Sequence, residues 1–337
     1  MIDLSPIAGR IEAHLGQATG GPAVVEGLRP LPGGACQDNL RVDVRFEAGP
    51  ERGLRRVVLR SDAASSLPGS IDRRAEHDVI GRAVEAGVTT PRSRWLGRGL
   101  VREEAWAHFL DWLDGEAIGR RVVASPELAA ARAGLAAEVA TELAKIHSVT
   151  PRAGEGPTEA PAAVAVRTAR HSLDSLQEPR PALEWALRWL AERIPDDPEV
   201  SLVHGDFRTG NLMVTPEGLS GVLDWEFAHW GSPYEDLAWI CVRDWRFGAL
   251  ALPVGGFARR AELNAAYEAA SGRILRPADA HWWEVMGNVR WAAGSLHQGE
   301  RYLSGESRDI ELIAVARRAA EMEFEALRLI GQGEEQG

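Results

Sequence analysis

The sequence predicts an α+β protein of two lobes, in which an antiparallel sheet with one main helix precedes a larger, mostly helical part. Three observations lead to this prediction. Period-two alternation of apolar residues is confined to the first third of the chain, helical periodicity dominates the rest, and a segment ending in glycine near residue 110 joins the two. We therefore divide the 337 residues into an N-terminal lobe (1–110), a hinge (111–115) and a C-terminal lobe (116–337).

The N-terminal lobe is predicted to begin with a short helix at Ile7–Leu15 and to continue as strands. Apolar residues alternate with polar ones from Leu40 to Phe46, which is the pattern of a half-buried strand. Glycine, proline and charge at Glu47–Gly53 indicate a hairpin turn. The main helix, Ile71–Ala86, stops at Gly87. The predicted strands are Val24–Leu31, Asn39–Phe46, Arg56–Arg60, Arg94–Leu96 and Ala105–Leu113.

The C-terminal lobe is predicted to be helical except for short strands and loops around residues 200–235. The predicted helix Ala278–Tyr302 carries an aromatic stripe, which either lines an acceptor pocket together with the predicted helix Phe257–Ser271 or belongs to the core. The stripe consists of Trp282, Trp283, Trp291 and Tyr302. The predicted helices are Pro126–Ser148, Ala182–Ile194, Leu237–Trp245, Phe257–Ser271, Ala278–Tyr302 and Asp309–Leu329.

Charge and composition exclude several classes of protein. The net charge is −11, and it is concentrated after residue 110, because residues 1–110 carry 15 arginines against 14 acidic residues. Such a surface argues against nucleic acid as a partner and is compatible with a cationic substrate or with a plain soluble surface. No apolar run approaches a membrane span, so no membrane partner is expected. Two cysteines without CxxC spacing, and no secretory pattern at the N-terminus, favour the cytoplasm.

The most informative segment runs from Val203 to Asn211 and is followed by Asp224-Trp225-Glu226. Two carboxylates and an amide at this spacing, each beside a short apolar run, suit phosphoryl transfer. We expect Asp206 to orient a substrate hydroxyl and accept its proton. Asn211 and Asp224 are expected to supply oxygen ligands to Mg²⁺.

Four further polar residues of this region have expected roles, and two of them have two readings each. Glu226 either reaches a second metal or water or forms a salt bridge in the loop. Arg208 either neutralises charge on the transferred phosphoryl group, as a catalytic residue, or braces Asp206. His204 is expected to support the loop through a hydrogen bond to backbone, and Asp236 is read as a helix N-cap.

These motifs are similar to those of the aminoglycoside phosphotransferase (choline kinase-like) family, which has the two-lobed protein-kinase-like fold. The resemblance extends from about residue 25 to 330. It implies ATP, or GTP in some members, together with Mg²⁺ and the hydroxyl group of a small molecule as the acceptor. The residues that carry it are His204-Gly205-Asp206 through Asn211, Asp224-Trp225-Glu226, and Ser232 to Ala238, supported by Leu31 to Gly34, Leu143 to His147, and Trp283 to Trp291.

The resemblance also assigns the nucleotide-binding residues of the N-terminal lobe. Gly33 and Gly34 allow backbone N–H groups to approach a phosphate without a Cβ clash. Arg60 is expected on the α- and β-phosphates, paired with Glu76 of the main helix, where drug-modifying members of the family have lysine. Backbone groups of the hinge, including Asp111 and Leu113, are expected to bind the adenine edge. The neighbouring Arg73 and Arg74 are expected to be solvated.

The leading hypothesis is therefore an ATP-dependent small-molecule kinase. Eleven residues separate Asp224 from Asp236, which leaves no room for the activation loop of a protein kinase. Two alternatives stay open: a nucleotide-binding pseudokinase with a sensing or scaffolding role, and a metal-dependent phosphohydrolase that uses the same carboxylates. The sequence leaves the acceptor and the oligomeric state open.

Overall fold

The computed structural model describes residues 4–31, 37–64 and 67–335. The chain forms two compact units, Met1–Asp114 with Ser220–Ala228, and Gly115–Leu219 with His229–Gly337. The predicted α+β class, with an antiparallel sheet before a larger helical part, is confirmed. The segment Ser220–Ala228, which carries Asp224 and Glu226, groups with the N-terminal unit, whereas the sequence prediction had placed it with residues 116–337.

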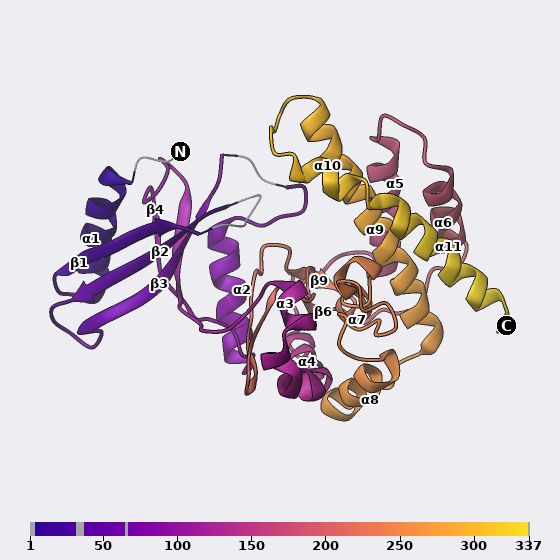
Figure 1. The fold of residues 1–337 in the computed structure, drawn as a ribbon, viewed down its shortest axis with the longest axis horizontal. Coiled ribbons are helices and arrows are strands. Elements are labelled where there is room, and N and C mark those ends of the chain that lie inside the picture. The colour runs from indigo at the N-terminus through magenta and orange to yellow at the C-terminus, as the bar shows by residue number, and fades with distance from the viewer. Residues whose placement is uncertain (1–3, 32–36, 65–66, 336–337) are drawn as a thin grey trace. The chain divides into compact units, whose positions relative to one another are not determined.

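The N-terminal unit is built on a five-stranded antiparallel sheet in the order β1-β2-β3-β5-β4 (Figure 1). The strands that the sequence predicted are present, and most are longer than predicted because ladder hydrogen bonds extend past the apolar runs. The elements of this unit are α1 (Ser5–Thr19), β1 (Ala23–Pro30), β2 (Gln37–Phe46), β3 (Gly53–Asp62), α2 (Arg73–Glu85), β4 (Ser93–Arg98) and β5 (Trp106–Asp111).

The two faces of this sheet have different chemistry, because successive residues of a strand point to opposite sides. Leu59 of β3 pairs in register with Phe109 of β5, and both lie in the apolar core that the buried residues of α1 complete. Their neighbours Arg60 and His108 lie on the other face, where both contact Glu76 of α2. One face of the sheet is thus a hydrophobic core, and the other carries a buried charge cluster.

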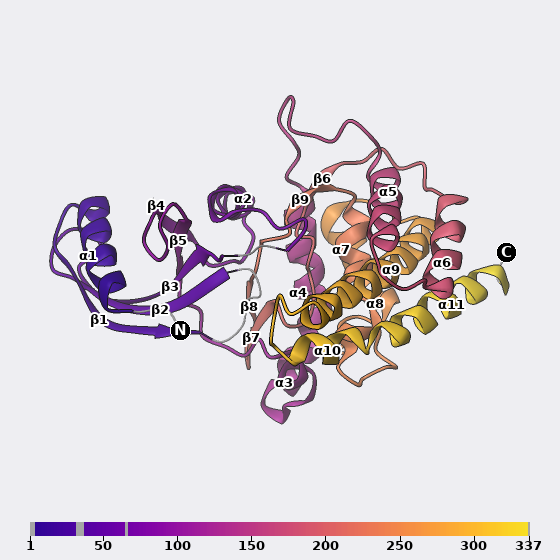
Figure 2. The same ribbon diagram turned by 90° about the horizontal axis from the view of Figure 1, so that it is seen from above.

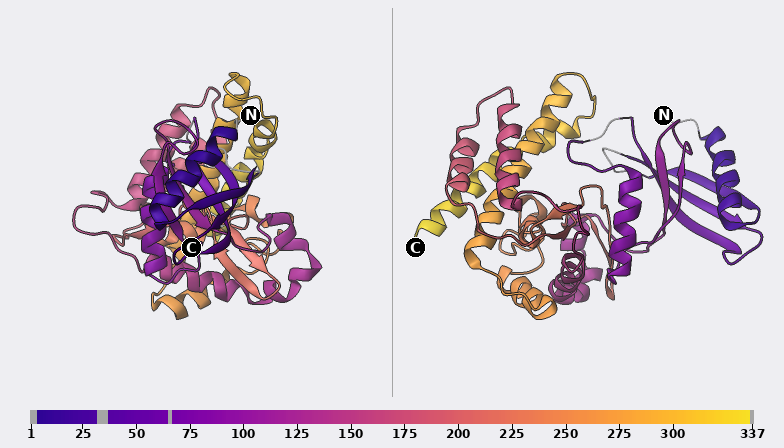
Figure 3. Two further views of the ribbon diagram at one scale, coloured as in Figure 1. Left: turned by 90° about the vertical axis from the view of Figure 1, so that its left-hand side faces the viewer. Right: turned by 180° about the vertical axis from the view of Figure 1, so that it is seen from behind.

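The C-terminal unit is mostly helical, and its long helix α9 packs against α5, α6, α7, α10 and α11 (Figure 2). A second pair, α4 and α8, packs side by side (Figure 3). The helices are α3 (Gly119–Ala124), η1 (Pro126–Leu128), α4 (Ala129–His147), α5 (Pro161–Asp174), α6 (Pro181–Ala191), α7 (Pro233–Trp239), η2 (Arg243–Arg246), α8 (Arg260–Ser271), α9 (Pro277–Leu303), α10 (Glu311–Ala316) and α11 (Ala319–Glu335). The short strands are β6 (Ser201–Val203), β7 (Leu212–Thr215), β8 (Gly218–Val222) and β9 (His229–Gly231).

Several helices of this unit differ from the prediction. The helix expected at Leu237–Trp245 begins earlier, at Pro233, because Ser232 caps it with a capping box, and it ends at Trp239. The single helix expected at Asp309–Leu329 is two helices, α10 and α11. Helices α3 and α5 were not predicted. The buried residues of α5 are Pro161, Ala162, Ala169 and Leu173, so only one of them is a large apolar side chain.

The three tryptophans of the aromatic stripe belong to the core rather than to a pocket, whereas Tyr302 is only half-buried. Trp282, Trp283 and Trp291 of α9 are buried in the apolar cluster formed with α5, α6, α7 and α11. The indole of Trp282 donates to the carbonyl oxygen of Leu190 (3.0 Å), which satisfies its buried N–H group. None of the described helices has both the length and the apolar composition that a membrane crossing needs.

Candidate active site

Asp206 lies on a loop of the C-terminal unit that connects β6 to β7. Gly205 and Gly210 adopt positive φ values of 77° and 117°, which side chains other than glycine rarely tolerate. The N–H of Asp206 donates to His204 Nδ1 (3.3 Å), so His204 supports the loop through backbone, as the sequence predicted. The loop conformation therefore depends on its glycines and on His204.

Three side chains donate hydrogen bonds to the Asp206 carboxylate. The indole Nε1 of Trp239 contacts Oδ1 (2.7 Å), the amide Nδ2 of Asn211 contacts Oδ2 (2.7 Å), and Nε of Arg208 lies 3.1 Å from both oxygens. Asp206 is only 9% exposed, so these donors replace water. Arg208 thus braces Asp206, which is the second of its two predicted readings. Trp239 was not among the predicted site residues.

The amide of Asn211 has only one orientation that satisfies its contacts. Its nitrogen lies 2.9 Å from the carbonyl oxygen of Asp206 and 2.7 Å from Asp206 Oδ2, and both partners are acceptors. The amide nitrogen must therefore face Asp206, which leaves Oδ1 of Asn211 without a hydrogen bond to any described residue. A free amide oxygen on a buried residue beside the loop is a suitable ligand for a hard cation.

The carboxylate of Asp236 in α7 anchors the loop through hydrogen bonds from backbone N–H groups. Its Oδ2 accepts from the N–H of His204 (2.7 Å), and its Oδ1 accepts from the N–H of Gly205 (2.9 Å). His147 of α4 also contacts Oδ2 (3.2 Å) and reaches the hydroxyl of Tyr267 (2.9 Å). Burial opposes the charge of Asp236, but its hydrogen bond to His147 and the nearby histidines outweigh burial and lower the pKa of the carboxyl.

The prediction that Asp236 is an N-cap is wrong. Ser232 caps α7 and accepts from the N–H of Tyr234, while Asp236 lies in the first turn and turns toward the loop. The sequence could not show this, because the residues that it contacts lie 31 and 32 positions earlier in the chain.

In the N-terminal unit, Arg60 sits within a buried charge cluster. Its Nη2 lies 3.0 Å from Glu76 Oε1 and 2.7 Å from Asp224 Oδ1, and it also donates to Gln37. The predicted ion pair between Arg60 and Glu76 is therefore present. Burial disfavours the charge on Glu76, but Arg60 and His108 more than compensate and lower its pKa to about 2. Glu76 is thus ionised and fixes the guanidinium.

Arg73 is a further member of this cluster and was not among the predicted site residues. It was expected to be solvated, yet it is 1% exposed and contacts Glu76 Oε2 at 2.9 Å. Its Nη1 donates to Gln37, and its Nη2 lies 3.7 Å from Glu226 Oε2. Its position three residues before Glu76 on α2 places both side chains on one helix face, and this spacing is a signal that could have identified it.

Asp224 and Glu226 are two acids with different pKa shifts. Burial alone would raise the pKa of Asp224, but the charge and hydrogen bond of Arg60 lower it. For Glu226, burial and the neighbouring Asp224 raise the pKa to about 7. Asp224 also has a φ of 69°, an uncommon conformation for a residue with a side chain and one often found at functional sites.

The oxygens of these acids fit a divalent cation. Oε2 of Glu226 is buried and makes no hydrogen bond with the described residues, and Oδ2 of Asp224 likewise has no hydrogen-bond partner among them. Free carboxylate and amide oxygens are the donors that Mg²⁺ prefers. Across the described part of the chain, no three His, Cys, Asp or Glu side chains gather into a metal-binding cluster.

Asp111 and Leu113, the two predicted hinge residues, differ in whether their backbone groups already form hydrogen bonds. The N–H of Asp111 donates to the carbonyl oxygen of Arg92 (3.1 Å), and its carboxylate pairs with Arg94 at 2.7 Å. By contrast, the backbone of Leu113 makes no hydrogen bond with the described residues. Leu113 therefore offers free backbone groups, whereas the N–H of Asp111 is occupied. Gly33 and Gly34 lie outside the described residues.

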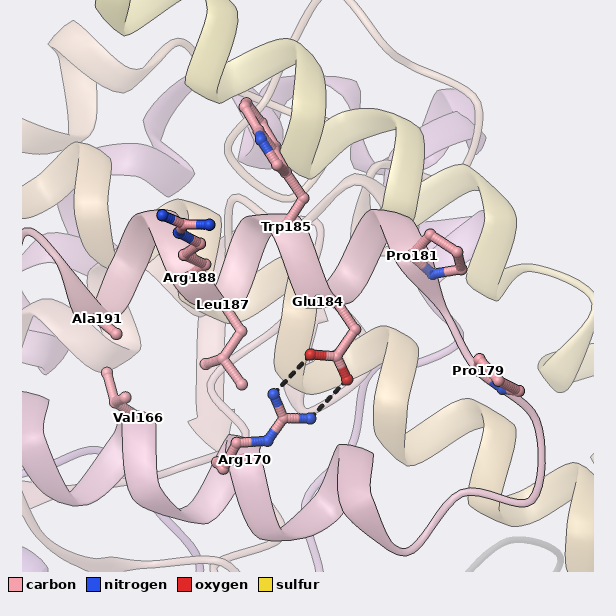
Figure 4. A pocket seen from close by; sticks show the side chains of 9 residues that line it. All are labelled: Val166, Arg170, Pro179, Pro181, Glu184, Trp185, Leu187, Arg188 and Ala191. Atoms are coloured by element: carbon pink, nitrogen blue, oxygen red, sulfur yellow. Dashed lines mark hydrogen bonds and ion pairs between the residues drawn. The ribbon is translucent and has the colours of Figure 1, made fainter.

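A cavity of about 740 Å³ lies elsewhere in the C-terminal unit, between α5 and α6 (Figure 4). Arg170 and Glu184 close one side with a two-pronged ion pair (2.6 Å for both hydrogen bonds). None of the predicted site residues lines it.

Comparison with known proteins shows the family and the fold. The model of the phosphotransferase enzyme family matches residues 27–273. Similar solved structures include a candidate aminoglycoside phosphotransferase from Ralstonia eutropha (TM-score 0.72, 20% identity, 96% of this chain and 98% of that one). Aminoglycoside phosphotransferase APH(4)-Ia, in a ternary complex with AMP-PNP and hygromycin B, is also similar (TM-score 0.62, 19% identity, 96% and 99% covered). A choline/ethanolamine kinase family protein from Mesorhizobium loti has a TM-score of 0.59 (16% identity, 96% and 95% covered).

Curated relatives match only part of this chain. The mouse acyl-CoA dehydrogenase family member 11 is 35% identical over 118 residues, which is 32% of this chain and 15% of that protein. The human member 11 is 43% identical over 61 residues, which is 17% of this chain and 8% of that protein. The chain thus spans a small fraction of the length of these relatives.

Proposed function

Since this chain belongs to the phosphotransferase enzyme family and has the kinase-like fold, we propose that it transfers the γ-phosphoryl group of ATP to a hydroxyl group of a small molecule. Three features support the proposal: the environment of Asp206, the free oxygens of Asn211, Asp224 and Glu226, and the buried pair of Arg60 with Glu76.

The observation that carries the proposal is the way Asp206 is held. Trp239, Asn211 and Arg208 fix both carboxylate oxygens with donors. A carboxylate held in this way orients an acceptor hydroxyl, which reduces the entropy lost on reaching the transition state. As the bond from the hydroxyl oxygen to the γ-phosphorus forms and the bond to the β–γ bridging oxygen breaks, Asp206 accepts the hydroxyl proton.

We propose that Asn211 and Asp224 hold Mg²⁺, with Glu226 as a further oxygen ligand. When bound, the cation neutralises charge on the nucleotide phosphates. Arg60 would contact the α- and β-phosphates, held in place by Glu76, and the backbone N–H groups of Gly33 and Gly34 would approach the phosphates. The free backbone groups of Leu113, with the carbonyl of Asp111, would bind the base edge of ATP or GTP.

The experiment compares Asp206→Ala with Asp174→Ala, which removes an exposed carboxylate of α5 in the same unit. ADP release is measured with a panel of hydroxyl acceptors. We expect Asp206→Ala to lower kcat by about 10²- to 10⁴-fold, the usual contribution of a positioned base. Asp174→Ala should leave kcat close to that of the wild type.

The acceptor panel follows the names of the similar proteins. Hygromycin B, spectinomycin, choline and ethanolamine represent the solved structures, and hydroxyacyl thioesters of coenzyme A represent the curated relatives. A protein that binds Mg·ATP but phosphorylates no member of a broad panel would support the pseudokinase alternative. Release of phosphate from monoesters without ATP would support the phosphohydrolase.

A further inference from the structure

Two arginines of the C-terminal unit lie on tryptophan rings beside the Asp206 loop. The guanidinium carbon of Arg208 is 4.5 Å from the ring centre of Trp245, and that of Arg290 is 4.6 Å from the ring centre of Trp239. The two rings are neighbours, with centres 5.8 Å apart. Stacking on an aromatic face fixes a guanidinium without using its hydrogen-bond donors.

Arg290 uses only part of its guanidinium for hydrogen bonds to described residues. Its Nη2 donates to the carbonyl oxygen of Gly205 (2.9 Å), the residue before Asp206. It forms no ion pair with any described carboxylate, in contrast to Arg243, Arg246 and Arg260, which all pair with glutamates. A cation of α9 is thus held one residue from the proposed base, half-buried and without a counter-charge.

Arg208 also keeps part of its guanidinium free. Its Nε contacts Asp206, and its Nη1 reaches the carbonyl oxygen of Thr209 only at 3.5 Å. Its Nη2 makes no hydrogen bond with the described residues. The side chain is 24% exposed, so a ligand can reach it.

Nearby acids do not cancel these charges, because arginines already neutralise them. Asp244 pairs with Arg318, and Glu284 pairs with Arg260. The chain as a whole has a net charge of −11, but two arginines lie beside Asp206. Arg208, which pairs with Asp206, and Arg290, which makes no ion pair with a described residue, thus place two positive charges beside this carboxylate.

We infer that the acceptor carries an oxyanion, a carboxylate or a phosphate, which Arg290 binds together with the free edge of Arg208. This inference rests on the proposed phosphotransferase function, because it places the acceptor hydroxyl at Asp206. Arginine donors bind planar carboxylates and phosphates through paired, charge-assisted hydrogen bonds. An acceptor whose only charge is positive would meet repulsion at this position.

Four probes test the inference: glycerate, glycerol 3-phosphate, glyceramide and 3-amino-1,2-propanediol. They share a three-carbon skeleton with a free hydroxyl and differ in the charge of one substituent. Binding is measured by calorimetry in the presence of Mg·AMP-PNP, and phosphorylation is measured with ATP. We expect the two anions to bind at least about tenfold more tightly than the neutral and cationic probes, as charge-assisted hydrogen bonds allow. A preference between the two anions distinguishes a carboxylate from a phosphate acceptor.

Arg290→Gln should remove most of this preference, and Arg290→Lys should retain part of it, because it keeps the charge but loses the paired donors. Arg193→Gln is the matched control, since Arg193 also lies on a tryptophan ring (5.1 Å from the centre of Trp189) but follows α6 rather than lying on α9. It should leave the preference unchanged. Circular dichroism of each variant verifies folding.

The inference fails if the wild type shows no preference for the anions, or if the preference survives in Arg290→Gln. It also fails if that variant weakens only the use of ATP, because Arg290 would then serve the nucleotide. Asp206-dependent phosphorylation of the neutral or cationic probe would keep the proposed function and overturn this inference. Selective anion binding through Arg290, without transfer to any acceptor, would overturn the proposed function and with it the inference about the acceptor, and would leave Arg290 as an anion-binding residue alone.

Discussion

Asp206 and Asp224 are both aspartates of the proposed site, yet their neighbours prepare them for different tasks. Asp206 accepts hydrogen bonds from an indole, an amide and a guanidinium, which hold both of its oxygens in place. Asp224 has one oxygen bound to Arg60 and Gln37 and the other without a partner among the described residues. The first arrangement suits a group that orients a hydroxyl, and the second suits a group that binds a cation through its free oxygen.

The raised pKa of Glu226 makes a prediction about stability. Its folded pKa is about 7, above the value of about 4.3 for an unfolded chain. The folded protein therefore binds more protons between these values, so the contribution is fully present below about pH 4.3 and is lost as the pH rises through 7. Glu226→Gln cannot titrate. Without Mg²⁺, its free energy of unfolding relative to the wild type should increase by about 1–3 kcal/mol from pH 5 to pH 8.

Urea unfolding at both pH values measures this change. Glu217→Gln, which alters an exposed glutamate beyond β7, is the control and should show no such change. An equal pH dependence in Glu226→Gln and the wild type would mean that Glu226 is not held protonated at neutral pH.

At the scale of single elements, the short helix α7 supplies two of the side chains that hold the Asp206 loop in place. Ser232 caps it, Asp236 anchors the backbone of the loop, and Trp239 donates to Asp206. Asp236 and Trp239 are three residues apart, so both lie on one face of the helix. The helix thus holds both the backbone of the loop and the carboxylate of Asp206.

Asp236 anchors the loop and Ser232 caps α7, and we expect the loss of the anchor to lower the free energy of unfolding more than the loss of the cap. Asp236→Ala leaves two backbone N–H groups and His147 without their buried acceptor, so we expect a loss of about 3–5 kcal/mol in the free energy of unfolding. Ser232→Ala removes only a cap and should cost about 1 kcal/mol. Tryptophan fluorescence during urea unfolding reports the change, because eight of the twelve tryptophans lie in the C-terminal unit. Similar losses for both variants would show that the anchor contributes no more than a cap.

At the scale of the whole molecule, the proposed function predicts that Mg²⁺ and a nucleotide stabilise the folded protein. A ligand that binds only the folded protein stabilises it by mass action. We therefore expect Mg·AMP-PNP at about 100 times its Kd to raise the free energy of unfolding by about 2.7 kcal/mol.

This stabilisation should depend on the cation. EDTA should remove most of it, and Asp224→Asn should require much higher Mg²⁺ to reach it, because the amide lacks the negative charge. Thermal unfolding at several Mg²⁺ concentrations measures both effects. If Asp224→Asn shows the same Mg²⁺ dependence as the wild type, Asp224 is not a cation ligand.

Much of the molecule was predictable because the decisive signals are local. Strand alternation, helix periodicity and turn residues predicted the antiparallel sheet before a helical part, and the family resemblance named the kinase-like fold that the comparisons confirm. The spacing of Asp206, Asn211 and Asp224 pointed to phosphoryl transfer. The pairing of Arg60 with Glu76 was also expected, although it joins a strand to a helix, because the fold places these two positions together.

Only the tertiary structure decided which distant residues complete each half of the site. Trp239 reaches Asp206 across 33 positions, and Arg290 reaches the carbonyl of Gly205 across 85. Arg73 looked like a surface residue, and its burial follows from how α2 packs on the sheet. A sequence shows the chemical type of a residue and its neighbours along the chain. Burial and long-range hydrogen bonds arise when elements pack, so they fix which arginine is buried, which acid has a raised pKa and which indole contacts Asp206.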